Sequence, residues 1–129
     1  MADVLKFIRE NDVKAIVVTG SVKRITNGLK RFRLPFVGVL TRFDTGHKKP
    51  HPEPMSRALE ILGCDASKVL SVGNQVIDLQ ASNAAGIDFA MASWGVNEYE
   101  REQLTRESDY VLEDPREIIV HLTSNTLHR

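Results

Sequence analysis

The sequence predicts an α/β fold built on a mostly parallel, Rossmann-like sheet with helices on both faces. Short, nearly continuous apolar runs alternate along the chain with stretches whose apolar residues recur at helical spacing. Strands of a parallel sheet are buried on both faces, so they read as apolar runs rather than as alternating patterns. At 129 residues, 42% of them apolar, the chain is long enough for one domain and short for two. We expect residues 1–129 to form a single domain.

The N-terminal part predicts two units in which a helix leads into a strand. Residues 3–11 carry apolar side chains at helical spacing, and residues 15–18 form an apolar run. A turn at residues 19–21 then leads into a predicted helix over residues 22–31. A second predicted strand covers residues 36–40.

Predicted helices and strands also alternate over residues 54–112. Pro54 suits the first turn of a helix over residues 54–62, and Gly63 suits its C-terminal cap. Further along, we predict strands over residues 69–72, 87–92 and 110–112, and helices over residues 78–85 and 97–106. The polar tail, residues 123–129, is expected to fray.

The composition indicates where in the cell the protein acts and which classes of partner it is expected to bind. Cys64 is the single cysteine and there is no zinc-type cysteine spacing. No apolar run approaches the roughly 20 residues needed to span a bilayer, and residues 1–10 lack the features of a signal peptide, so we expect a cytoplasmic protein without a membrane partner. Residues 1–49 hold eleven Lys/Arg against four Asp/Glu, whereas residues 50–129 hold six against thirteen. Much of the positive charge falls on the predicted helix over residues 22–31 and its exit, without interleaved aromatic residues. We interpret it as a solvated helix face rather than a nucleic-acid surface.

The sequence offers two candidate phosphate-binding positions. One directly follows the first predicted strand, and the other precedes the predicted helix over residues 54–62. In an open parallel sheet, ligands bind beyond the carboxyl ends of the strands. Thr19, Gly20 and Ser21 follow the first strand and offer a hydroxyl and backbone N–H groups at a helix start, although the same residues also suit a simple helix cap. Lys49 lies in a proline-rich segment, residues 48–54, that would hold its ammonium in a fixed direction unless this is only a rigid solvent loop.

A candidate cation site follows the third predicted strand. Asn74 comes directly after that strand, and Asp78 lies four residues further on. Their amide and carboxylate oxygens are ligands that suit Mg²⁺. Asp78 also has a plainer interpretation, as a carboxylate that stabilises the start of a helix.

Taken in order, these motifs resemble those of the haloacid dehalogenase superfamily, and most closely its phosphoglycolate phosphatase-like branch. The likeness rests on residues 17–21, 49–54, 72–78 and 84–87, and it extends through Trp94-Gly95 and residues 108–111. It implies that Thr19 and Lys49 act in catalysis, with Gly20 and Ser21 helping to bind phosphate, and that Asp78 and Asn74 help to hold Mg²⁺. The substrate would be a small phosphorylated metabolite, attacked by an aspartate to give an aspartyl-phosphate that water then hydrolyses.

The sequence departs from this family in two respects. The family's nucleophile lies in an Asp-x-Asp motif that ends an earlier, central strand, and no Asp-x-Asp occurs among these 129 residues. Asp3, Asp12 and Asp44 are not placed to replace it. Asn74 stands where the family usually has an acidic metal ligand, which weakens the expected affinity for Mg²⁺.

Two hypotheses follow. The chain is expected to be a phosphohydrolase core without its first strand and cap domain, inactive alone and completed by a chain or segment that supplies the first strand. The alternative is a non-catalytic module that binds a phosphate ligand or a protein. The strands at residues 15–18 and 69–72 would either pair directly or leave a gap to be filled. A receiver domain and a nicotinamide-binding domain fit less well, because their acidic and glycine-rich motifs are absent.

Overall fold

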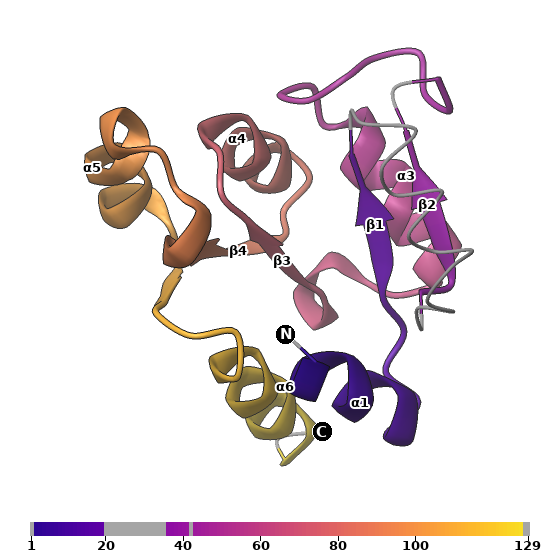
Figure 1. The fold of residues 1–129 in the computed structure, drawn as a ribbon. Coiled ribbons are helices and arrows are strands. Elements are labelled where there is room, and N and C mark those ends of the chain that lie inside the picture. The colour runs from indigo at the N-terminus through magenta and orange to yellow at the C-terminus, as the bar shows by residue number, and fades with distance from the viewer. Residues whose placement is uncertain (1, 20–35, 42, 128–129) are drawn as a thin grey trace.

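The computed structural model describes residues 2–19, 36–41 and 43–127, with side chains described up to residue 123 (Figure 1). The predicted helix over residues 22–31 lies outside these ranges. The helices are α1 (Ala2–Glu10), α3 (Glu53–Leu62), α4 (Val76–Ala84), α5 (Glu98–Glu107) and α6 (Glu117–Leu127), and short 3₁₀ helices lie at η1 (Ala66–Lys68) and η2 (Ser93–Gly95). The strands are β1 (Ile16–Val18), β2 (Gly38–Leu40), β3 (Leu70–Gly73), β4 (Asp88–Ala92) and β5 (Tyr110–Leu112).

The predicted α/β class is confirmed, and all the strand pairs are parallel. They form two sheets, one of order β1-β2 and one of order β3-β4-β5. Val17 lies opposite Val39 in the first sheet, and Val72 lies opposite Ala90 in the second. Each predicted strand is present, and β5 begins and ends at the predicted residues.

The two sheets are not joined by hydrogen bonds between strands. Within the described residues, β1 pairs with β2 alone and β3 pairs with β4 alone. Figure 1 shows β1 and β2 against α3, and β3 and β4 next to α4. Of the two possibilities that the sequence left open, direct pairing of residues 15–18 with residues 69–72 is therefore excluded. Among residues 2–19, 36–41 and 43–127, no strand pairs with the second edge of β1 or of β3.

Side chains hold the two halves together instead. A buried cluster is formed by Met55 of α3, Ala81 of α4 and Ile87. Val18 of β1 and Val69, just before β3, pack against it from the two sheets. Because α3 also contacts α4 directly, the halves associate through helices rather than through backbone pairing.

A second cluster forms the core of the three-stranded half. Leu79, Phe89, Met91 and Leu104 are almost completely buried there, and they come from α4, β4 and α5. Apolar surface removed from water in this way is the main favourable contribution to folding. The cluster fixes α4 over β4, and so fixes the residues at the start of α4.

Helices α4 and α6 differ from the sequence predictions in ways that matter for the fold. Helix α4 begins at Val76 rather than Asp78, because Gln75 and Asp78 form a capping box and the Val76 N–H donates to the Glu100 carboxylate of α5 at 3.1 Å. Helix α6 was not predicted. It extends to Leu127, into the tail that we expected to fray, and it packs against α1 (Figure 1).

The predicted end of α3 is confirmed. Gly63 adopts φ of 65°, and its N–H donates to the Leu59 carbonyl at 2.9 Å. None of the helices in the described ranges is long and apolar enough to cross a membrane.

Candidate functional site

Lys49 lies where the two sheets approach each other. Its ammonium is 2.6 Å from Asp78 Oδ1, and it donates to the Val18 carbonyl at 3.2 Å. Val18 ends β1, and Asp78 lies in the first turn of α4, directly after β3. The two side chains are only 14% and 11% exposed. One largely enclosed cation therefore contacts both the end of β1 and the first turn of the helix that follows β3.

Asp78 is positioned by its neighbours as well as by Lys49. Its second oxygen, Oδ2, accepts a hydrogen bond from the Gln75 backbone N–H at 3.2 Å. Gly73 lets it approach, because a Cβ at position 73 would lie 2.8 Å from the Asp78 Cβ. Both interpretations of Asp78 from the sequence thus coexist, since the carboxylate caps α4 and also faces Lys49.

Thr19 lies at the end of β1, beside β2. Its backbone N–H donates to the Leu40 carbonyl at 2.9 Å, which continues the β1–β2 pairing by one bond. The residue is half-buried. Gly20 and Ser21, the other predicted phosphate-binding residues, lie outside the described residues.

Asn74 is held by a different neighbour. Its side-chain nitrogen donates to the Gly95 carbonyl at 3.1 Å, and the residue is exposed. A Cβ at position 95 would lie 2.9 Å from this nitrogen, so glycine leaves room for the contact. The structure therefore joins Lys49 to Asp78 and directs the Asn74 amide nitrogen towards η2.

Asp78 and Asn74, which follow β3, offer too few oxygen ligands to hold Mg²⁺ by themselves. The cation needs six oxygens in octahedral geometry, usually from one or two carboxylates together with water and substrate phosphate. Asp78 provides one carboxylate, already paired with an ammonium, and Asn74 provides an uncharged amide oxygen. These residues fit Mg²⁺ only as part of a larger ligand set.

Asp44, a carboxylate that the sequence placed in the loop before Lys49, stabilises a turn. Its Oδ2 accepts hydrogen bonds from the Thr41 backbone N–H at 2.6 Å and from the Thr41 hydroxyl at 3.0 Å. These bonds, the backbone one first, lower the pKa of Asp44. Its place in this turn gives no support to a role as nucleophile.

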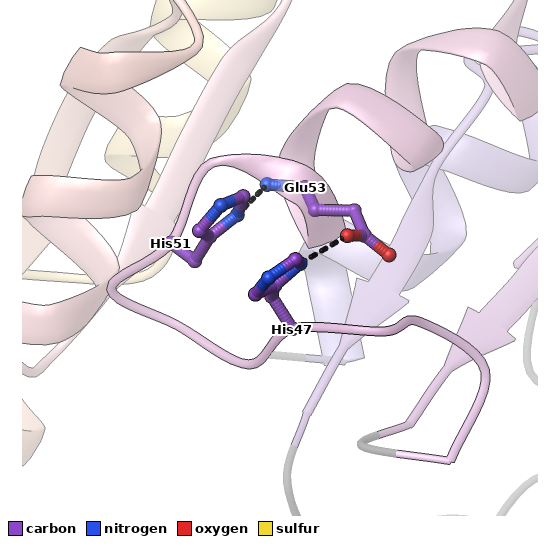
Figure 2. Close-up of side chains that lie close together, drawn as sticks. All are labelled: His47, His51 and Glu53. Carbon is purple, nitrogen blue, oxygen red and sulfur yellow. Dashed lines mark hydrogen bonds and ion pairs between the residues drawn. The ribbon is translucent and has the colours of Figure 1, made fainter.

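The loop that carries Lys49 also holds a cluster that the sequence analysis did not single out. Figure 2 shows His47, His51 and Glu53 close together at the start of α3. The signal available in the sequence was the short spacing of two histidines and a glutamate, His-x₃-His-x-Glu.

Comparison with known proteins supports the resemblance seen in the sequence. A family model of haloacid dehalogenase-like hydrolases matches residues 1–92. The pyrophosphatase PpaX of Anoxybacillus flavithermus is 34% identical over 121 residues, which cover 91% of this chain and 55% of that protein. A phosphoglycolate phosphatase of Xylella fastidiosa is 35% identical over 105 residues, covering 76% of this chain and 46% of that protein.

Solved structures share the fold. A HAD-superfamily hydrolase from Geobacter sulfurreducens has a TM-score of 0.77 and 28% identity, covering 94% of this chain and 58% of that one. A second, from Ehrlichia chaffeensis, has a TM-score of 0.76 and 20% identity, covering 97% and 57%. The chain spans about half the length of the curated relatives that it matches. By its family match and its relatives, this chain belongs to the haloacid dehalogenase-like hydrolases, in their phosphoglycolate phosphatase-like branch.

Proposed function

We propose that this chain provides the phosphate-binding part of a phosphohydrolase site that acts on a small phosphorylated metabolite. The observation that carries the proposal is the position of Lys49, whose ammonium contacts both Asp78 and the end of β1. A cation in this half-enclosed place would neutralise the charge on the phosphoryl oxygens during transfer. Thr19, with Gly20 and Ser21, would donate hydrogen bonds to the same oxygens.

The aspartate nucleophile would come from a strand that enters between β1 and β3. Both strands have an edge without a strand partner in the described residues, and Lys49 contacts the carboxyl end of one and the helix that follows the other. A parallel strand placed there would end beside Lys49, so an aspartate at its end would face the phosphate. The source of this strand would be a further segment or a partner chain.

Magnesium would neutralise phosphate charge when bound, with Asp78 and the Asn74 amide oxygen as two of its ligands. The inserted strand would have to supply a further carboxylate, because this chain offers an incomplete set. Without that strand we expect neither tight Mg²⁺ binding nor turnover.

A phosphate-binding module without catalysis is a second candidate, and Asn74 is the observation that favours it. An amide in place of a carboxylate lowers the negative charge next to Asp78, which suits anion binding better than cation binding. This candidate predicts that inorganic phosphate binds equally well with and without Mg²⁺, and that Lys49→Ala abolishes the binding.

The test is a complementation assay. The chain would be co-expressed with the N-terminal part of a phosphoglycolate phosphatase relative, which supplies an apolar strand ending in Asp-x-Asp. Hydrolysis of p-nitrophenyl phosphate, phosphoglycolate and pyrophosphate would then be measured with Mg²⁺. The last two probes are chosen from the names of the relatives.

We expect turnover only when both parts are present. It should fall at least a hundredfold with Lys49→Ala or when the supplied nucleophilic aspartate is replaced by asparagine. A complex that co-purifies but has no activity would contradict the phosphohydrolase proposal and leave the binding module. Turnover by the chain alone, abolished by Lys49→Ala, would refute the need for an added nucleophile.

A further inference from the structure

We propose that His47, His51 and Glu53 form a binding site for a divalent transition metal ion such as Zn²⁺, separate from the Lys49–Asp78 pair. Each residue offers one ligand atom, and the three atoms all lie within 4.8 Å of one another. Two imidazoles and one carboxylate are an established ligand set for zinc, with water in the remaining position. The site goes beyond the proposed phosphohydrolase function and does not depend on it.

Hydrogen bonds orient the Glu53 carboxylate. Its Oε1 accepts a hydrogen bond from the Gly46 N–H at 2.5 Å, and its Oε2 lies 2.6 Å from His47 Nδ1 (Figure 2). The His47 contact, followed by the Gly46 N–H bond, lowers the pKa of Glu53. The carboxylate is therefore held by hydrogen bonds beside the His47 ring.

The two imidazoles lie one over the other. The rings of His47 and His51 are stacked, with centroids 3.9 Å apart and planes 10° from parallel. His51 Nδ1 accepts a hydrogen bond from the Glu53 backbone N–H at 3.0 Å, which fixes that ring next to the start of α3. Both rings therefore lie beside the start of α3, and a shared ion would require their nearly parallel planes to tilt towards it.

Two of the ligand atoms lie closer together than a zinc ion would hold them. Ligands about 2.0–2.1 Å from a tetrahedral zinc ion lie roughly 3.3 Å apart, whereas His47 Nδ1 and Glu53 Oε2 are 2.6 Å apart because a hydrogen bond joins them. Zinc bound at His47 Nδ1 would displace the proton of this hydrogen bond, which a neutral ring would carry on Nε2 instead, and the two atoms would move from 2.6 Å to roughly 3.3 Å apart. The residues are wholly or partly exposed, so the movement is not opposed by core packing.

The ligand types favour zinc over Mg²⁺. Imidazole nitrogen suits Zn²⁺, Cu²⁺ and Ni²⁺, whereas Mg²⁺ prefers oxygen and keeps much of its water. The nearby Lys49 ammonium opposes a second cation less than a free lysine would, because Asp78 pairs with it. The site lies beside a shallow depression lined by Gly46, His47, Lys48, Lys49, Pro50 and His51, which leaves it open to solvent ions.

Metal binding would also close the loop that carries Lys49. His47 and Glu53 lie on either side of Lys49 in the sequence, so a shared ion would link the two ends of residues 47–53. We expect zinc to slow backbone amide exchange over residues 46–53, the Lys49 amide included, while amides of β4 remain unchanged.

The decisive experiment is calorimetric titration of the full chain with ZnCl₂ in millimolar MgCl₂. We expect one saturable site with micromolar affinity, weakened at least tenfold by each of His47→Gln, His51→Gln and Glu53→Gln. Matched control variants are His121→Gln, whose ring packs on Tyr110, and Glu60→Gln, on the exposed face of α3. The controls should bind zinc as the unmodified chain does, and circular dichroism without metal would establish that every variant is folded.

Other outcomes would overturn the proposal. Affinity within threefold of the unmodified chain in folded His47→Gln and His51→Gln variants would exclude the site. Loss of binding in Cys64→Ser, or a near-ultraviolet thiolate band with Co²⁺, would assign the metal to the exposed thiol of Cys64 instead. Competition by Mg²⁺ at millimolar concentration would also contradict a nitrogen-based site.

Discussion

At the scale of single residues, Lys49 has a structural role as well as a proposed chemical one. Few charged side chains are this enclosed unless they are paired, and Lys49 is paired both with a carboxylate and with a carbonyl. Removing one partner of such a pair leaves the other charge poorly solvated. The stability of the region around β1 and α4 should therefore depend on both charges together.

We expect Lys49→Met and Asp78→Asn each to lower the free energy of unfolding by about 1–3 kcal/mol, a cost typical of an unpaired, partly buried group. The double variant should lose less than the sum of the two. Urea denaturation of the four proteins would measure this coupling. Lys6→Met is the control, because its 4.0 Å pair with Glu10 is exposed and should contribute less than about 0.5 kcal/mol.

The Asp114–Arg116 pair before α6 gives a prediction about pH. Hydrogen bonds from the Arg116 side chain and backbone lower the pKa of Asp114 from 3.8 to about 2. Because the folded pKa lies below the unfolded one, the stabilisation is complete above pH 3.8 and is lost as the pH falls towards 2. An NMR titration of the Asp114 carboxyl carbon would measure the shift, and Arg116→Gln should return the pKa towards 3.8.

At the scale of elements, the turn from β3 into α4 positions the site. β3 ends at Gly73, Gln75 caps the helix, and Asp78 enters the first turn close to the Gly73 backbone. A larger residue at position 73 would occupy the volume of the Asp78 side chain. The end of β3, the cap of α4 and the Lys49–Asp78 ion pair therefore depend on one another.

Gly73→Ala tests this dependence. A Cβ 2.8 Å from the Asp78 Cβ cannot be accommodated without movement of α4 or of Asp78. We expect a loss of about 1–3 kcal/mol in stability, in the range of overpacked sites, and a change in the chemical shift of Lys49 Nζ. Gly38→Ala is the matched control, since its Cβ would lie 3.8 Å from the nearest Ile16 atom.

The sequence predicted the helices and strands better than it predicted which side chains come together at a site. Buried strands and the amphipathic helix α3 leave periodic patterns, and Gly63 marks a helix end through its backbone conformation. Helix α6 was missed, because its polar C-terminal part resembles a frayed tail. Lys49 and Asp78 were singled out because their spacing matches a family. His51 and Glu53 lie within the same motif, residues 49–54, and His47 just before it, but nothing in the sequence pattern showed that their side chains come together.

At the scale of the whole molecule, the separation of the sheets is the feature that the sequence left undecided. Apolar runs show which residues form strands, but pairing depends on which edges come together in space. Here Met55, Ala81 and Ile87 hold the halves together through α3 and α4, while β1 and β3 stay unpaired with each other.

Amide hydrogen exchange should reveal this arrangement. β4 is bonded on both sides, by β3 and β5, so the Ala90 and Met91 amides should exchange most slowly. The β1 amides should exchange faster, because only one edge of β1 is paired with a strand in the part of the chain that the structure describes. Protection of β1 and β3 should rise when the complementing segment is added, and equal protection in β1 and β4 without it would contradict the open edges.

The open edges also bear on how the chain behaves in concentrated solution. Unpaired strand edges are templates for the strands of other molecules. With 17 basic and 17 acidic residues, the chain has no net charge near neutral pH, so copies do not repel one another at long range. Colloidal stability of the isolated chain should therefore be lowest near neutral pH and low salt, and occupation of the edges by a complementing strand should raise its solubility.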